Sequence, residues 1–151
     1  MAATEARLGV WHNKPAFSLA DIYPKATADE KFYEHTLAAV DPTTGEATAV
    51  TDATDAEALV AVVGRYQDDD AFAGGSQNVG PGKTQWVELT HGYLVELNFD
   101  GDVSTVSPGD NVYGVDNDTV NTTDTNVFVG RIYQTLESNG TVKVYVPGIL
   151  G

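Results

Sequence analysis

The sequence predicts a mostly β protein, with an antiparallel β-barrel or β-sandwich body that follows an extended N-terminal arm. Apolar and polar residues alternate along much of the chain after residue 31, which is the period of a half-buried strand. Turn signals separate these segments at short intervals, and many short strands so spaced are typical of sandwiches and barrels. Pro15 and Pro24 argue against a long helix near the N-terminus.

The alternation predicts where the strands lie. Tyr93, Val95, Leu97 and Phe99 share one face of a segment, and the valines at positions 142, 144 and 146 do the same in another. Asn139-Gly140 favours a tight hairpin between the last two strands. The Ala-rich stretch 52–59 is the one candidate for a short helix in the body. We expect strands near 32–40, 47–51, 59–67, 84–90, 93–99, 111–115, 119–121, 127–135 and 141–146.

Charge divides the chain into two parts. Residues 1–35 hold five acidic and four basic residues, whereas residues 36–151 hold 17 acidic and four basic residues. We therefore expect an extended N-terminal arm over residues 1–31 and a β domain over residues 32–151. Three aromatic residues of the arm, Trp11, Phe17 and Tyr23, either anchor the chain to a partner or pack on its own domain.

A weak internal sequence repeat suggests a duplicated β unit. The order of a strand, a turn, a strand, a Val-Gly-Arg strand and a further strand occurs twice. Val63-Gly64-Arg65 resembles Val129-Gly130-Arg131, and residues 37–41 resemble residues 112–116. The same similarity can arise by chance among short β motifs, so the sequence leaves both interpretations open.

Composition excludes several classes of protein. The formal net charge of −14 repels nucleic acid. With no cysteine, the chain lacks disulfides, thiolate nucleophiles and Cys-based zinc sites. No stretch approaches the roughly 18 apolar residues of a membrane helix. Residues 1–10 lack the basic and apolar regions of a signal peptide, so we expect synthesis in the cytoplasm and no membrane partner.

No motif predicts catalysis, and we expect a non-enzyme without a cofactor or a metal. Gly80-Pro81-Gly82-Lys83-Thr84 resembles the end of a P-loop, but Gln77 replaces its first glycine and a strand, not a helix, follows. The three histidines share no metal-ligand spacing. The acidic loops at 68–70, 100–102 and 116–118 offer oxygen atoms to Ca²⁺ but do not follow the EF-hand pattern, and solvated turns explain them more simply.

A series of motifs from about residue 35 to residue 146 resembles the capsid decoration (cement) proteins of tailed bacteriophages. It includes the turn at 41–47, the Val-Val-Gly-Arg strand at 62–65 and an acidic Gly-rich loop at 68–82. Its most specific stretch is Pro108-Gly109-Asp110-Asn111-Val112-Tyr113, which leads to Val127-Phe128-Val129-Gly130-Arg131. The resemblance implies a β-barrel or sandwich on the outer surface of the virion capsid, often trimeric, that bridges major capsid protein subunits and stabilises the shell.

These expectations name two sets of site residues. The arm residues expected to bind the capsid are Trp11, Lys14, Pro15, Phe17, Ile22 and Tyr23. The strand face expected to mediate self-association is Tyr93, Val95, Leu97 and Phe99. The alternative function is a carbohydrate- or receptor-binding β-sandwich module of a phage tail or surface fibre, with Trp86, Tyr93 or Tyr113 as a stacking platform. A small hydrolase is a third and weaker alternative.

Overall fold

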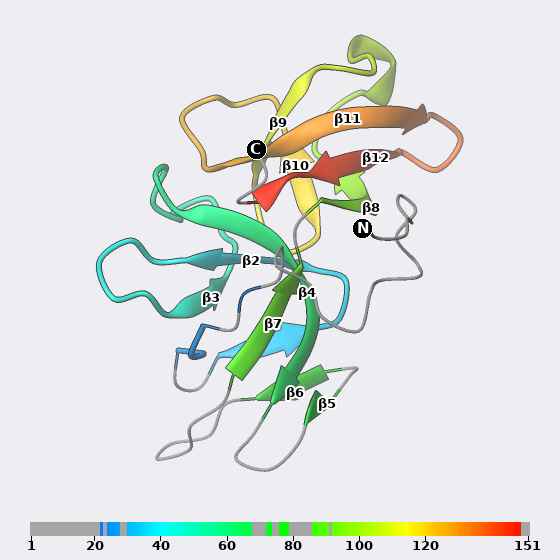
Figure 1. Cartoon of the computed structure of the whole chain (residues 1–151). Helices are drawn as coiled ribbons and strands as arrows, with labels where there is room; N and C mark the ends of the chain where they lie inside the picture. The colour runs from blue at the N-terminus through cyan, green and yellow to red at the C-terminus, as the bar shows by residue number, and fades with distance from the viewer. Residues whose placement is uncertain are drawn as a thin grey trace, which may run out of the picture.

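The computed structural model describes residues 22, 24–27, 30–67, 72–73, 76–78, 86–90 and 92–148. Within this part of the chain the fold is mostly β, as predicted, and contains no α-helix. The strands form a closed five-stranded barrel, a five-stranded sheet and a small two-stranded sheet (Figure 1). The small sheet pairs β1 (Lys31–Tyr33) with β6 (Ser76–Asn78).

The closed barrel, called here the second barrel, is built from the C-terminal strands. They are β8 (Tyr93–Phe99), β9 (Asn111–Gly114), β10 (Thr119–Asn121), β11 (Phe128–Leu136) and β12 (Thr141–Val146). The order around the wall is β10-β8-β12-β11-β9. All neighbours are antiparallel except β8 and β10, whose parallel pairing closes the ring. Alternate side chains of each strand therefore point into the barrel.

The other sheet is closed in the same way by a short N-terminal segment. Its strands are β2 (Leu37–Val40), β3 (Ala47–Ala49), β4 (Leu59–Gln67), β5 (Phe72–Ala73) and β7 (Trp86–Thr90). Ile22 pairs with Leu89 of β7 in antiparallel fashion, and Ala26 pairs with Ala47 of β3 in parallel fashion. Ile22 and residues 24–27, called here the closing segment, thus join the two edges of β3-β2-β4-β7. We call this ring the first barrel.

The two barrels share one strand order and one register. In each, a hairpin of short strands precedes a long strand, which pairs with the next strand across a bulge. The duplicated unit is therefore present, but the register aligns Val63 with Ile132 and not with Val129. Five strand pairs of the first barrel each have an equivalent in the second barrel. Leu37↔Val62 corresponds to Asn111↔Arg131, Val62↔Thr90 to Arg131↔Tyr145, Val40↔Ala47 to Gly114↔Val120, Ile22↔Leu89 to Val95↔Val144, and Ala26↔Ala47 to Phe99↔Val120.

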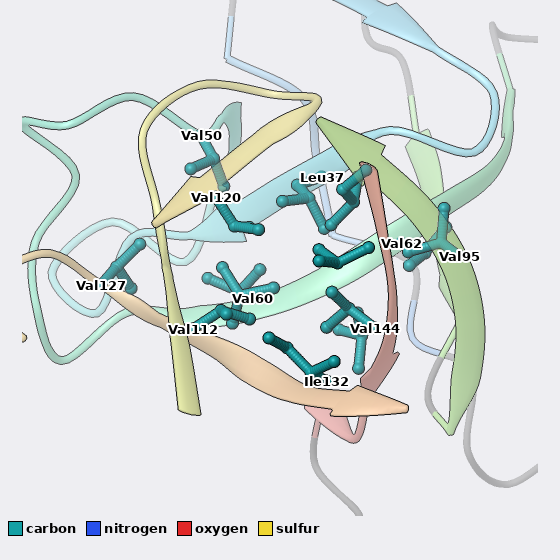
Figure 2. Close-up of a cluster of buried hydrophobic side chains, with 14 of the residues drawn as sticks. Leu37, Val50, Val60, Val62, Val95, Val112, Val120, Val127, Ile132 and Val144 are labelled. Carbon is teal, nitrogen blue, oxygen red and sulfur yellow. The ribbon is translucent and has the colours of Figure 1, made fainter. Parts of the chain in front are cut away.

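Two apolar clusters hold the barrels together. The first barrel encloses small side chains such as Ala38, Ala47 and Ala61, together with Val63 and Leu89. The outer face of its β2 and β4, formed by Leu37, Ala39, Val60 and Val62, belongs instead to the core of the second barrel. Figure 2 shows side chains of this face directed at valines of the second barrel wall. Because β4 contacts β8, β11 and β12, this face closes one end of the second barrel.

Several local features differ from the sequence predictions. The predicted strand 32–40 is divided into β1 and β2 by a turn in which His35 adopts a left-handed φ of 67°. The expected helix at 52–59 is a pair of turns, held by hydrogen bonds to Thr54 Oγ1 and Asp55 Oδ1. A short 3₁₀ helix, Val103–Thr105, follows β8 and was not predicted; Asp102 caps it by accepting a hydrogen bond from the Ser104 main-chain N–H.

Candidate interaction surfaces

Most of the predicted capsid-binding residues lie outside the described part of the chain. They are Trp11, Lys14, Pro15, Phe17 and Tyr23. Ile22 is described, and it lies in the closing segment of the first barrel, partly buried against the core formed by Val63, Val87 and Leu89. The described end of the predicted arm is therefore part of the first barrel.

Main-chain hydrogen bonds fix the closing segment. The N–H of Ile22 donates to the Leu89 carbonyl at 3.1 Å, and the N–H of Leu89 donates back at 2.9 Å. Pro24 has no N–H but accepts from Val87, so proline is compatible with this position. Lys25 accepts from Ala47 at 2.7 Å, and Thr27 donates to Ala47 at 2.9 Å. Because Ala26 is buried and Lys25 is exposed, the segment alternates like a barrel strand.

The residues predicted to mediate self-association point into the second barrel. Val95 and Leu97 are buried in its core, and Tyr93 and Phe99 pack against that core while partly exposed. Tyr93 also stacks on His35 with ring centroids 5.9 Å apart. Its burial, with a smaller effect of the Glu34 charge, raises the pKa of the Tyr93 hydroxyl. Buried side chains offer no contact area to a second molecule, so Val95 and Leu97 act here as core residues.

The opposite face of the same strands is exposed and partly aromatic. A row of directly paired residues crosses four strands, with Asn111 next to Arg131, Arg131 next to Tyr145, and Tyr145 next to Leu94. Leu94 is 44% exposed and Tyr145 is 42% exposed. Tyr133, 62% exposed, lies further along β11. The sequence contained the signal for this face, since leucine and tyrosine occupy positions that the alternation places outside.

Charge on this outer face differs from charge elsewhere in the second barrel. Arg131 and Lys143 are the only two basic residues among positions 92–148, which hold eight acidic residues. Both bases lie on strands, and Glu96 is the one acidic residue on a strand, directly across from Lys143. The other seven acidic residues lie in the connections between strands. The outer face is therefore the basic part of an otherwise acidic barrel.

The aromatic residues of the alternative carbohydrate platform do not share a face. Tyr113 points outward from β9, where its ring meets Phe128 edge to face at 5.9 Å. Tyr93 lies on the inward side of β8, in line with Val95 and Leu97. The side chain of Trp86 lies outside the described part of the structure. Tyr93 and Tyr113 thus form no common stacking surface, because they occupy opposite sides of the barrel wall.

The acidic turns in the described residues use their carboxylates to hold the backbone. Asp102 accepts hydrogen bonds from the main-chain N–H and the hydroxyl of Ser104, and these bonds lower the pKa of its carboxyl group. Asp116 Oδ1 accepts from the N–H of Asp118 at 2.9 Å. Within the described ranges, no group of three or more His, Cys, Asp or Glu side chains is arranged to hold a metal ion. The triplet 68–70 lies outside those ranges.

Comparison with known proteins adds no relative: no family model, curated protein or solved structure matches the chain. Among the described residues, no helix is long and apolar enough to cross a membrane.

Proposed function

We propose that this protein is a structural component of a tailed-phage virion that binds the outside of the capsid and stabilises the shell by bridging major capsid protein subunits. The observation that carries the proposal is the ordered series of motifs that resembles phage decoration proteins. Its most specific stretch, residues 108–113, leads into β9, and its partner stretch, residues 127–131, enters β11. The two strands pair in one barrel wall, which agrees with the β-barrel that the resemblance implies.

Two physical features support this function. The net charge of −14 favours the outside of a shell over contact with packaged DNA. The outer face of β2 and β4 packs into the core of the second barrel, so a close-packed apolar contact joins the two barrels, which suits a body that bridges neighbouring subunits. A small domain binds weakly on its own, but many copies on one shell act through avidity.

The N-terminal segment is the proposed attachment element. It has almost no net charge, and it carries Trp11, Phe17 and Tyr23 ahead of a strongly acidic body. Aromatic side chains contribute much of the binding energy in protein interfaces. Because Ile22 belongs to the first barrel, the segment available for attachment ends near residue 20, and Trp11 and Phe17 are its aromatic residues.

Co-sedimentation with empty, expanded shells of the cognate phage tests the proposal. We expect the full chain to sediment with the shells and to raise their temperature of disassembly. A variant that lacks residues 1–20 should remain folded, as judged by circular dichroism, but should stay in the supernatant. If the full chain fails to bind shells and instead binds ligands in a glycan screen, the tail-fibre alternative replaces this proposal.

A further inference from the structure

The two barrels have an equivalent outer sheet face, which is buried in the first barrel and exposed in the second. Leu37, Val62 and Thr90 form a row across β2, β4 and β7, and all three are buried. The equivalent row in the second barrel is Asn111, Arg131 and Tyr145, and all three are exposed. The first row lies on the sheet face that closes the end of the second barrel. The outer face of the first barrel thus forms an interface within the molecule, whereas the equivalent face of the second barrel is exposed to solvent.

The open face has the composition of an interface and not of an ordinary surface. In the described part of the chain, five large hydrophobic side chains are exposed, and four of them, Leu94, Phe128, Tyr133 and Tyr145, lie on the outer side of the second barrel. Exposed hydrophobic patches mark interaction sites. Tyrosine and arginine are also the residues most enriched among those that dominate binding energy, and Arg131 lies next to Tyr145 in this row.

The repeat also indicates which surface fits this face. The second barrel meets the first with the end that carries its β9–β10 turn, where the Asn117 carbonyl accepts a hydrogen bond from the Leu37 N–H at 2.7 Å. The equivalent end of the first barrel carries the β2–β3 turn and the start of β4. The connections 41–46 and 51–57 at this end, called here the acidic end, contain five acidic residues and no basic one: Asp41, Glu46, Asp52, Asp55 and Glu57.

We propose that the outer face of the second barrel, centred on Leu94, Arg131, Tyr133 and Tyr145, binds the acidic end of the first barrel of a second copy of this chain. This contact between two molecules would reproduce the packing that joins the two barrels within one molecule. Arg131 and Lys143 complement the carboxylates of the acidic end, and the tyrosines and Leu94 supply apolar area. The inference goes beyond the proposed capsid role and does not depend on capsid binding.

Such a contact is heterologous, because it joins two different surfaces. Heterologous contacts build closed rings when the rotation between copies closes, and open filaments when it does not. A closed ring of three copies would give the trimer that the resemblance implies.

Two variants test the pairing of these surfaces. The face variant carries Arg131→Glu and Tyr145→Ser, at two exposed positions. The end variant carries Asp55→Asn and Glu57→Lys, where asparagine keeps the side-chain oxygen that accepts the Glu57 N–H. We expect each variant alone to associate at least about tenfold more weakly than the wild type in sedimentation equilibrium. An equimolar mixture should form a one-to-one complex, because each variant retains the surface that the other has lost.

Matched controls separate this effect from a general change in charge. Asp124→Asn with Glu137→Lys makes the same charge change in connections of the second barrel, and Lys25→Glu reverses a base on the first barrel. These variants should associate like the wild type, and all variants should give wild-type circular dichroism spectra. The proposal is overturned if the wild-type chain is monomeric at every concentration, or if either variant associates normally. It is also overturned if the mixture stays monomeric, since the intact face of one variant and the intact acidic end of the other would then not bind each other. Shell binding, measured separately, reports on the capsid role.

Discussion

Gly130 of β11 lies against the main chain of Tyr145 in β12. A Cβ atom at this position would overlap the main-chain carbonyl oxygen of Tyr145, which cannot move without breaking the pairing of the two strands. Gly45 provides a contrast, because its φ of +73° favours glycine but a Cβ atom there would have no neighbour within 4 Å.

We expect Gly130→Ala to lower the free energy of unfolding by about 2–3 kcal/mol through overpacking. Gly45→Ala should lower it by only about 1 kcal/mol, the cost of a left-handed conformation for a residue with a side chain. Urea denaturation of the two variants measures both values. Equal losses would show that steric overlap at Gly130 is not the dominant effect.

Leu94 and Leu97 test which face of β8 is available to a partner. Leu97 is 2% exposed, so Leu97→Ala should lower the free energy of unfolding by about 2–5 kcal/mol. Leu94 is exposed, so Leu94→Ala should change it by less than about 0.5 kcal/mol. Self-association should show the opposite order, with Leu94→Ala the weaker associating variant among folded molecules. Weaker association for Leu97→Ala alone would favour the inward face instead.

Tyr93 makes stability sensitive to alkaline pH. Its pKa is raised above the ordinary value of 10.0, so the folded state favours the neutral phenol. The stabilisation is present below the pKa of the unfolded chain and is lost as pH rises through the higher pKa of the folded chain. We expect the wild type to lose more stability than Tyr93→Phe between pH about 9 and pH about 11. Thermal unfolding at these two pH values measures the difference, and parallel losses would contradict the prediction.

At the scale of the elements, the strands were predictable because their period is local. The boundaries of β4, β8, β10 and β12 agree with the alternation of apolar residues, since burial on one side of a sheet imposes that pattern. The turn at His35 was missed because no Gly or Pro marks it. The alanines of the stretch 52–59 favour a helix, but the stretch is too short to be stable as a helix without packing.

The role of the closing segment was not predictable from local pattern. Its alternation extends over only a few residues, and Pro24 argues for an irregular arm. Its place depends on two partners distant in sequence, Leu89 of β7 and Ala47 of β3. Likewise, the alternation on β8 predicts which residues share a face of the strand but not which residues of neighbouring strands lie beside them. The alternation places Leu94 and Tyr145 outside, but their grouping with Arg131 in one row depends on the register of β8, β11 and β12.

Truncation tests the closing segment as an element. Removal of residues 1–20 should leave the free energy of unfolding nearly unchanged. Removal of residues 1–30 eliminates five main-chain hydrogen bonds to β3 and β7, each worth about 1 kcal/mol, and should lower the free energy of unfolding by roughly 3–5 kcal/mol. The shorter chain should also aggregate, because the edges of β3 and β7 become unpaired. Urea denaturation and light scattering measure both effects, and equal stability of the two truncated chains would contradict this assignment.

At the scale of the whole molecule, two electrostatic effects of different range act on self-association. The net charge of −14 makes copies repel each other over long distances, whereas Arg131 attracts carboxylates only at close contact. The Debye length falls from about 30 Å at 0.01 M salt to about 8 Å at 0.15 M and about 3 Å at 1 M. Moderate salt therefore screens the repulsion between whole molecules before it weakens the close charge pairs.

We accordingly expect self-association to strengthen between about 0.01 M and about 0.15 M salt and to weaken again toward about 1 M, where the close pairs are screened as well. Sedimentation equilibrium at these three salt concentrations measures the dependence. The face variant with Arg131→Glu lacks the attractive charge, so any residual association should only strengthen as salt rises. If wild-type association weakens steadily from the lowest salt concentration, the attraction between charged surfaces outweighs the net repulsion at every range. If it strengthens steadily up to about 1 M, apolar contacts of Leu94, Tyr133 and Tyr145 dominate and Arg131 contributes little.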